Sequence, residues 1–541
     1  MRLPEMKYAD KIRKSKQIKF GGLNHSNAAG DGDLWDMKNL TSDHYPLLAT
    51  RQKRLLYRTL ESGGGLFSWE KLLWVDGTEV YFDGEAVGQV TEGEKAFASL
   101  GAYVVIFPDK CWFHVDTKEF GSLESKWSGA SLTFDNGTIY GEEAFANTIT
   151  CEGVDWSEWF HAGDAVTISG CKKQPGNNKT IIIREIDGDK LTFYENSFTL
   201  VGDGTAGYTE TGSMKIERTV PDLDFVCENE NRLWGCNETT IYACKLGDIF
   251  NWNVADGLAS DSYSVDTGSA GAFTGCISYL GYPTFFKEDH IYKVYGSIPS
   301  NFEVMGSSTL GLAKGCGGSL AIAGETLFYL NRSGIIAYTG GIPQPVGSAF
   351  GMERYHNAVG GSDGLKYYVS MENEDDEWSL FVYDTQRGLW HREDDTRITH
   401  FARWNGNLYY LNSGGEIWIT GNVHCAPGDA TEEESIDWVA EFGDFTNEDP
   451  NKKGISKLQL RLELEEGAEV EVWLQFDSDG VWRPSGHAVG ESAKRSYYLP
   501  IVPRRADHYR LKLTGTGGCR VHSLVVEQYS GSELRSRNGR N

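Results

Sequence analysis

Three short motifs in this chain have the residue types for phosphate, nucleophile or calcium chemistry. Gly202–Gly207 matches GxGxxG, which binds a pyrophosphate only where a helix follows, but residues 213–220 (SMKIERTV) predict a strand. Gly360–Gly364 matches the nucleophile pattern GxSxG, and a strand-like segment follows it too. Asp477–Gly480 has the first residues of a calcium loop, yet position 12 of that loop is Ala488 instead of glutamate. We interpret all three motifs as turns and expect no cofactor and no metal.

Acidic residues are the other candidates, because glycoside hydrolases use a pair of carboxyl groups. They occur in two runs, Glu372 with Glu374–Glu377, and Glu432–Glu434. Neighbouring like charges are typical of solvated loops, whereas a general acid needs an isolated, buried carboxyl group with a raised pKa. The ten cysteines include no CxxC pair, which predicts free thiols. We therefore assign no catalytic residue and expect no enzyme activity.

The overall charge excludes several classes of partner. Asp and Glu number 77 against 51 Lys and Arg, which gives a formal net charge of −26. A chain this acidic gains no general counterion-release affinity for nucleic acid or anionic lipid. The longest uncharged apolar stretch, residues 102–108, is far shorter than the ~20 residues that cross a bilayer. We expect no membrane-spanning segment and no specific DNA binding.

Both ends of this acidic chain are basic. The tail, residues 531–541, contains three arginines and one glutamate. Such ends are typical of solvated termini, but they could also be arms that lie against an acidic neighbouring subunit. The candidate subunit-contact residues in the first arm are Arg2, Lys7, Lys11, Arg13, Lys14 and Lys16.

The elements that would position these residues are short strands. There are 64 glycines but only 14 prolines, and helical signals are scarce, although residues 92–100 could form a turn or two of helix. A hairpin with a turn containing Asp, Asn or Gly recurs seven times, and this recurrence predicts a β-propeller of six to eight blades, with seven favoured. The seven hairpins are at residues 72–84, 103–116, 232–248, 283–296, 327–341, 366–390 and 407–421.

Two further domains interrupt or follow the hairpins. Residues 124–218 contain their own strands, with Asp187-Gly188 at a hairpin turn, and predict a small inserted β-barrel or sandwich. After residue 426, Leu458, Leu460, Leu462 and Leu464 alternate with polar residues, which predicts an antiparallel β-sandwich. The predicted order is a basic arm (1–30), a propeller (31–123 and 219–425) with its insertion (124–218), a C-terminal sandwich (426–530) and a basic tail (531–541).

Several segments resemble the propeller proteins of bacteriophage and prophage virions. The segments are residues 30–54, 232–252, 281–304, 476–482 and 499–519. Among these proteins, the segments are most similar to the propeller proteins of phage necks and tails, such as the packaged-DNA stabilisation and tail nozzle proteins of short-tailed phages. This resemblance implies a homo-oligomeric ring, expected to be a hexamer, in contact with other tail or neck proteins.

The sequence therefore leads to one expected function and two alternatives. We expect a structural virion component, assembled in the host cytoplasm, that acts as a tail or neck nozzle, hub or adaptor during DNA ejection. DNA would pass through its acidic ring without binding. The first alternative is a receptor- or glycan-binding propeller module of a phage tail, and the second is a glycoside hydrolase.

Overall fold

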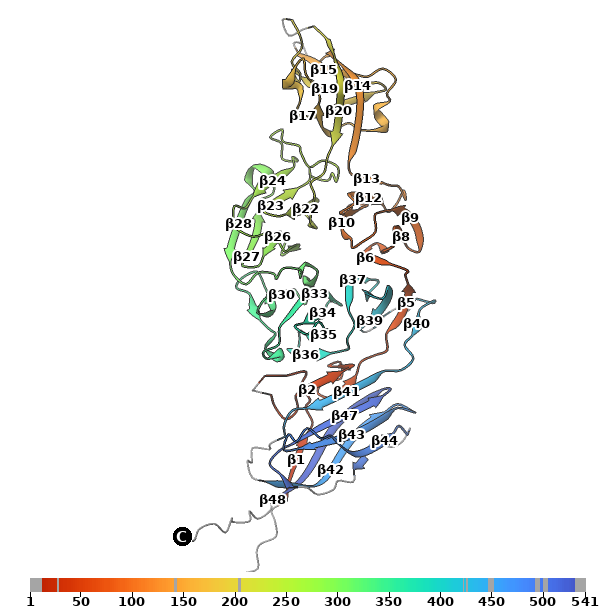
Figure 1. Ribbon diagram of the computed structural model, residues 1–541, viewed down its shortest axis with the longest axis vertical. Helices are drawn as coiled ribbons and strands as arrows, with labels where there is room; N and C mark the ends of the chain where they lie inside the picture. Colours follow the sequence, from red (N-terminus) through yellow and green to blue (C-terminus); the bar gives the residue numbers. More distant parts are fainter. Residues whose placement is uncertain are drawn as a thin grey trace, which may run out of the picture. The chain divides into compact units, whose positions relative to one another are not determined.

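The computed structural model describes residues 12–26, 29–140, 144–202, 206–421, 423–424, 427–445, 452–491, 497–499 and 505–530. Within these residues almost all regular structure is β, so the all-β prediction is confirmed (Figure 1). The chain forms two compact units, residues 62–317 and residues 1–61 with 318–541. The described helices are short 3-10 turns: η1 (Trp156–Glu158), η2 (Pro175–Asn177), η3 (Pro299–Asn301), η4 (Gly317–Ser319) and η5 (Ser348–Phe350).

The unit of residues 62–317 contains four sheets of four consecutive antiparallel strands, which is the pattern of propeller blades. The first two are β6 (Gly63–Trp69), β7 (Lys71–Asp76), β8 (Glu79–Phe82) and β9 (Glu85–Gln89), then β10 (Ala96–Leu100), β11 (Tyr103–Phe107), β12 (Cys111–His114) and β13 (Phe120–Ser122). The next two are β21 (Phe225–Asn229), β22 (Arg232–Asn237), β23 (Thr240–Ala243) and β24 (Tyr263–Asp266), then β25 (Gly275–Tyr279), β26 (Tyr282–Lys287), β27 (His290–Tyr295) and β28 (Glu303–Ser308).

The other unit contains three more blade sheets, and one of them is completed by a strand from far away in the sequence. Strand β5 (Leu55–Thr59) pairs with β39 and so supplies the fourth strand of the last blade, with β40 (Thr431–Glu432) beyond it. The remaining strands are β29 (Ala321–Ala323), β30 (Thr326–Asn331), β31 (Gly334–Tyr338), β32 (Gln344–Pro345), β33 (Tyr355–Ser362), β34 (Lys366–Asn373), β35 (Trp378–Asp384), β36 (Leu389–Arg392), β37 (Ile398–Trp404), β38 (Asn407–Asn412) and β39 (Glu416–Thr420).

The blade sheets bury both of their faces, because each packs on its neighbours. In β7, four consecutive residues, 72–75, are buried. Leu73 and Phe82 of one blade pack with Val104 and Phe113 of the next. Seven blade sheets follow one another in the described chain, so the β-propeller class is confirmed. In residues 92–100, which could have formed a turn or two of helix, the structure has strand β10 from Ala96 to Leu100 instead.

The inserted domain is one seven-stranded sheet around an aromatic core. Trp127 and Trp156 stack edge to face at its centre, with ring centroids 4.8 Å apart. Gly188, at φ 56°, forms the predicted hairpin turn between β18 and β19. The strand path is open at β17 and β18, so the described sheet is not a closed barrel. Its strands are β14 (Ser125–Tyr140), β15 (Ala144–Thr150), β16 (Ala165–Ser169), β17 (Thr180–Ile182), β18 (Glu185–Asp187), β19 (Lys190–Glu195) and β20 (Tyr208–Arg218).

The predicted antiparallel sandwich is present, with two sheets that combine both ends of the chain. One has the order β3-β4-β48-β42-β45, with β1 on β48 and β46 on β42, and the other is β2-β41-β47-β43-β44. In Figure 1, red strand β1 lies with blue strands β42 and β48. The strands are β1 (Ile12–Gln17), β2 (Leu34–Lys38), β3 (Leu40–Thr41), β4 (Leu48–Thr50), β41 (Asp437–Phe442), β42 (Lys453–Leu464), β43 (Glu469–Phe476), β44 (Arg483–Val489), β45 (Tyr497–Leu499), β46 (Arg505–Ala506), β47 (Tyr509–Thr516) and β48 (Cys519–Ser530).

The structure corrects two predicted boundaries. Residues 31–50, which the sequence assigned to the propeller, form β2–β4 of the sandwich, and residues 12–17 of the predicted arm add a strand to one of its sheets. Leu34 and Met37 are fully buried there, and Met37 pairs with Ala440. Residues 431–432, which the sequence assigned to the sandwich, pair with β5 in the last blade sheet. Strands this short have no local pattern that identifies the distant strand with which they pair, so the sequence could not assign them to a sheet.

The first testable prediction concerns this shared core. Met37→Ala should lower the free energy of unfolding by about 2–5 kcal/mol, because the deletion leaves a cavity in a core to which both chain ends contribute. Denaturant unfolding would measure the change, with Lys38→Ala, on the opposite face of β2, as the matched control. Equal stability of the two variants would contradict the placement of β2 in the sandwich core.

Candidate functional site

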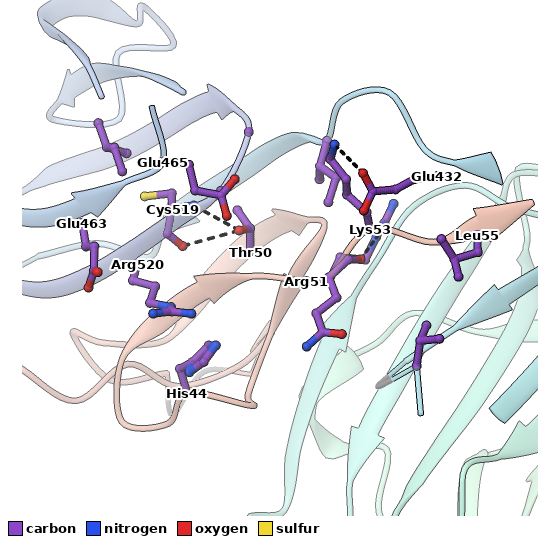
Figure 2. Close-up of a pocket in the computed structure, with 16 residues that line it drawn as sticks. His44, Thr50, Arg51, Lys53, Leu55, Glu432, Glu463, Glu465, Cys519 and Arg520 are labelled. Carbon is purple, nitrogen blue, oxygen red and sulfur yellow. Dashed lines mark hydrogen bonds and ion pairs between the residues drawn. The ribbon is translucent and has the colours of Figure 1, made fainter. Parts of the chain in front are cut away.

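A cavity of about 880 Å³ lies beside the sandwich, in the unit of residues 1–61 and 318–541 (Figure 2). One part of its lining is the linker between β4 and β5, and another part is the start of β48 with the end of β42. The lining combines basic, acidic and small apolar side chains. It consists of His44, Thr50, Arg51, Gln52, Lys53, Leu55, Val423, Glu432, Ile436, Glu463, Leu464, Glu465, Gly517, Gly518, Cys519 and Arg520.

Ion pairs hold the linker in place. The Arg51 guanidinium binds the Glu433 carboxylate through two hydrogen bonds, of 2.8 and 2.9 Å. Two parallel bonds fix both distance and orientation, so this pair is stronger than a single contact. Lys53 adds a pair with Glu432 at 3.3 Å, which Figure 2 shows at the edge of the cavity.

On another side of the cavity, a hydrogen bond between a backbone N–H and a side-chain hydroxyl joins two strands. The Cys519 amide donates to the Thr50 hydroxyl at 3.1 Å, so β48 and β4 are tied together here. Burial raises the pKa of the Cys519 thiol to about 12. A thiol with this pKa is protonated at neutral pH and is therefore not an activated nucleophile.

Two basic side chains of the cavity form no side-chain hydrogen bond or ion pair with a residue that the structure describes, although the charge of His44 contributes to lowering the pKa of neighbouring Asp43. Arg520 and His44 are exposed, and Figure 2 shows their side chains close to one another. Glu463 and Glu465 belong to the same lining. The cavity can therefore hydrogen-bond a polar ligand that carries both donors and acceptors, but it does not select one sign of charge.

Behind the cavity lies a group of buried charges that we call the Arg54 cluster: Arg51, Arg54, Glu393, Asp394 and Glu433. Arg54 is 4% exposed and contacts Glu393 at 2.5 Å and Asp394 at 2.6 Å. It also donates to the Tyr410 hydroxyl at 3.2 Å. The cluster therefore connects the linker to the end of β36, to β38 and to the residue after β40.

The charges of the Arg54 cluster hold two of its carboxyl groups, those of Asp394 and Glu433, in the ionised form. Burial would raise the pKa of Asp394, but the Arg54 charge and hydrogen bonds from Thr396 and Arg54 lower it to about 2. Burial also opposes ionisation of Glu433, yet Arg51 holds the pKa of that carboxyl group below its ordinary value. These carboxylates stabilise the fold and are not poised to donate protons at neutral pH.

A second cavity, of about 310 Å³, shares His44 and Gln52 with the first. The lining of this second cavity includes Asp384, which accepts hydrogen bonds from Ser42 at 2.5 Å and from Arg387 at 2.7 Å. His391 of β36 is buried, and burial together with the Lys366 charge lowers its pKa to about 4. This imidazole is therefore neutral at physiological pH.

The motifs singled out from the sequence are dispersed over the fold and do not converge on one site. Gly360, Gly361 and Ser362 are the last residues of strand β33 and pair with β34, and only Asp363 and Gly364 lie in the turn, so the interpretation of the whole motif as a turn is wrong for its first three residues. Part of Gly202–Gly207 lies outside the described residues, and strand β20 follows it, as expected. The acidic run at residues 372–377 forms the tip of the β34–β35 hairpin, while Glu432 and Glu433 are used in ion pairs.

Two groups of side chains have a spacing that a metal ion could use. In each group one ligand atom per residue lies within 4.8 Å of the others: His356, Glu372 and Asp376, and Asp477, Asp507 and His508. In the second group His508 already contacts Ser478 Oγ at 2.7 Å, and the Asp507 amide donates to Asp477 at 2.8 Å. Asp477–Gly480 is the turn between β43 and β44, as predicted.

The basic arm is partly built into the sandwich. Arg13, Lys14 and Lys16 are exposed residues of β1, which pairs with β48 of the same chain. Lys14 forms an ion pair with Glu527 at 2.8 Å. The other predicted contact residues, Arg2, Lys7 and Lys11, and the tail at 531–541 lie outside the described residues.

Sequence reasoning missed the Arg54 cluster. Its signal was the basic run RQKR at residues 51–54, immediately before the first blade strand. A basic run usually lies on a solvated surface. No feature of the neighbouring sequence indicates that Arg51 and Arg54 are buried in the fold, with only 6% and 4% of their surface exposed.

Comparisons of the sequence with protein families and curated proteins give no match. No protein-family model matches it, and no curated protein matches it in sequence. No helix among the described residues is long and apolar enough to cross a membrane.

Solved structures show only distant likeness. BamB from Moraxella catarrhalis aligns with 70% of this chain and 99% of its own, at 9% identity and a TM-score of 0.33. Raptor from Chaetomium thermophilum aligns with 70% of this chain and 29% of its own, at 12% identity and a TM-score of 0.32. An exo-beta-1,3-galactanase from Phanerochaete chrysosporium covers 56% of this chain and 94% of its own, at 8% identity and a TM-score of 0.22. Similarity at these values carries no argument about function.

A prediction follows from the Arg54 cluster. Arg54→Leu should lower the free energy of unfolding by about 3–5 kcal/mol, because two buried carboxylates lose their counter-charge. Arg58→Leu is the matched control, since Arg58 pairs with Asp429 at the surface and such pairs contribute about 0–1 kcal/mol. Denaturant unfolding of both variants would measure the difference, and an Arg54 effect no larger than the Arg58 effect would refute the role of the cluster.

The buried imidazole of His391 predicts a pH dependence. Between pH 6.5 and about 4 the unfolded chain binds a proton at His391 that the folded chain excludes, so stability falls as the pH is lowered through this window. The loss should approach about 3 kcal/mol at the lower end. His391→Gln should flatten the dependence measured by denaturant unfolding at several pH values, whereas substitution of exposed His487 should leave it unchanged. Parallel curves for wild type and His391→Gln would contradict this assignment.

Proposed function

We propose that this chain is a structural component of the neck or tail of a tailed phage, a nozzle, hub or adaptor whose copies form a ring around the DNA channel. One observation carries the proposal: strands that are far apart in the sequence are paired within one unit. Strands β1–β4 pair with the C-terminal strands of the sandwich, and β5 completes the blade of β37–β39. Segments that are paired in this way resist local opening, which suits a part that bears load during DNA ejection.

The sequence segments that resemble virion propellers support the phage assignment. The net charge of −26 supports a channel that DNA crosses without adhering, because phosphates gain nothing from an acidic surface. The ring, expected to contain six copies, follows from the same resemblance.

The state of the carboxyl groups supports a structural role over glycoside hydrolysis. A general acid at neutral pH needs a raised pKa. In the described residues, each carboxyl group with a displaced pKa is displaced downward by basic partners or hydrogen bonds, as Asp43 is by Lys366 against the effect of burial. Charged carboxylates of this kind hold elements together.

The direct test is the composition of particles. Phage particles purified from producing cells should contain the chain at a fixed ratio to the major capsid protein, measured by quantitative mass spectrometry. An abundant host cytosolic protein serves as the control for contamination. Particles that lack the chain, or contain it only at the level of the host control, would refute the proposal.

A second candidate, a receptor- or glycan-binding module, is favoured by the 880 Å³ cavity, whose lining includes exposed Arg520 and His44. Arrayed acidic and neutral glycans probe this function directly. Retention of one glycan class by the wild-type chain, and its loss in Arg520→Ala, would support binding in the cavity, whereas retention unaffected by Arg520→Ala would place the binding elsewhere.

A further inference from the structure

A serine, a histidine and an aspartate of the sandwich are joined in a row by hydrogen bonds. The Ser478 hydroxyl is 2.7 Å from Nε2 of His508, and the other ring nitrogen, Nδ1, contacts a carboxylate oxygen of Asp507. Ser478 belongs to the turn between β43 and β44, whereas Asp507 and His508 connect β46 to β47. We call these three residues the Ser478 triad.

The pairing of two strands brings these residues together. Phe476, the last residue of β43, pairs with Tyr509, the first residue of β47, so the residues after Phe476 lie beside those before Tyr509. The Asp477 backbone N–H donates to the His508 carbonyl at 3.2 Å. In return, the Asp507 backbone N–H donates to the Asp477 carboxylate at 2.8 Å. The backbones of the two segments are therefore fixed to each other directly beside the hydrogen bonds of the triad.

The turn that contains the serine has a strained backbone. Ser478 has a φ of 49°, in the left-handed region that residues with a side chain rarely adopt. Arg483 holds the next residue of the turn, because its two terminal guanidinium nitrogens donate to the Asp479 carboxylate at 2.7 and 3.2 Å. Strained residues that their surroundings hold in place occur at active sites, and a sharp turn exposes the nucleophilic serine of many hydrolases.

The order of the contacts suits removal of the hydroxyl proton by the imidazole. With its proton on Nδ1, His508 donates to the Asp507 carboxylate, and the lone pair on Nε2 accepts the hydrogen bond from Ser478. Serine hydrolases of unrelated folds use this same order, from serine Oγ to Nε2 and from Nδ1 to a carboxylate. Such a site is recognised by the geometry of its three side chains, so its place in a β-sandwich is no objection.

The triad is open to solvent, so a substrate has access to it. Ser478 is exposed, and 22% of the His508 side chain is accessible. The backbone N–H groups of Ser478 and Gly480 donate to no residue in the described part of the chain, so they are available to a negatively charged oxygen that develops beside Oγ. Neither cavity described above includes the triad. A long acyl chain would stay in water at such a site, which therefore favours a small acyl group.

We propose that the Ser478 triad hydrolyses esters of small carboxylic acids, with acetyl esters as the substrate class. Ser478 Oγ forms a bond to the carbonyl carbon while its proton passes to Nε2 of His508. The bond from that carbon to the alcohol oxygen then breaks, and Nε2 returns the proton to the departing alcohol.

Water completes the reaction in the same way. A water oxygen forms a bond to the acyl carbon, and the proton that it loses passes to Nε2. The bond from the acyl carbon to Oγ breaks, Oγ takes the proton from Nε2, and the carboxylic acid leaves. Ser478 and His508 are the catalytic residues, and Asp507 is a positioning residue that orients the imidazole. This activity goes beyond the proposed virion function and does not depend on it.

The first experiment labels the nucleophile. The full chain is incubated with a fluorophosphonate, whose phosphorus forms a bond to an activated serine oxygen as fluoride leaves, and peptide mass spectrometry locates the adduct. We expect the label on Ser478 in the wild type and its loss in His508→Gln, because an unassisted hydroxyl is a weak nucleophile. A wild-type chain without label on Ser478, or equal labelling of Ser478 in His508→Gln, would overturn the inference.

The second experiment measures hydrolysis of 4-nitrophenyl acetate. Ser478→Ala and His508→Gln should each lower kcat/KM about 100-fold or more, and the double variant should lose no more than either, because the two residues act as a unit. Asp507→Asn should lower kcat with KM unchanged, since this carboxylate acts through the imidazole. Ser456→Ala and His487→Gln remove an exposed hydroxyl and an exposed imidazole of the same sandwich and should leave the rate unchanged. Denaturant unfolding confirms that each variant is folded.

Two further measurements define the reaction. A metal ion on Asp477, Asp507 and His508 would activate water directly, so loss of hydrolysis in excess EDTA would overturn the triad mechanism, and an unchanged rate would support it. Cleavage of 4-nitrophenyl octanoate should be about tenfold slower than that of the acetate, and equal rates would overturn the assignment to small acyl groups. Equal hydrolysis by wild type and Ser478→Ala would overturn the inference as a whole.

Discussion

The buried charges around Arg54 are the interaction on which the unit of residues 1–61 and 318–541 depends. Buried ions are stable only when each has a counter-charge and hydrogen bonds of good geometry. Arg51 and Arg54 meet this condition with partners from two separate stretches of the chain, Glu393–Asp394 and Glu433. The cluster can form only when the linker, the end of β36 and the residue after β40 are all in place, so it specifies their arrangement as well as stabilising it.

Polar contacts continue from this cluster toward the sandwich. Asn39 donates to the Asp437 carbonyl at 2.7 Å and accepts from Arg51 at 2.7 Å, which joins β41 of the sandwich to the linker. The backbone N–H of Asn39 donates to the Glu393 carbonyl at 2.6 Å. One short segment between β2 and β3 therefore touches sandwich, linker and blade, and the two architectures of this unit are connected by directional bonds rather than by a flexible tether.

How much could be predicted from the sequence follows from the range of each interaction. The alternation of Leu458, Leu460, Leu462 and Leu464 predicted a strand with one buried face, and all four side chains are buried. The Asp187-Gly188 turn was also predictable, because the positive φ of Gly188 is a local requirement. These features depend on neighbours in the chain. The pairing of Met37 with Ala440 and the burial of Arg54 depend on partners that no local pattern identifies.

The cavity was beyond sequence reasoning for the same reason. In the sequence, Arg520 has the pattern of a surface residue of a strand, and its place beside His44 arises from the packing of β48 against the linker.

The pairing of strands that are far apart in the sequence also sets an order of events on the ribosome. Strands β1–β5 are translated long before their partners β39, β41 and β48. Until those partners have been made, the earlier strands have open edges, and neither the last blade nor the sandwich can close. A product that stops before β48 therefore cannot complete this unit.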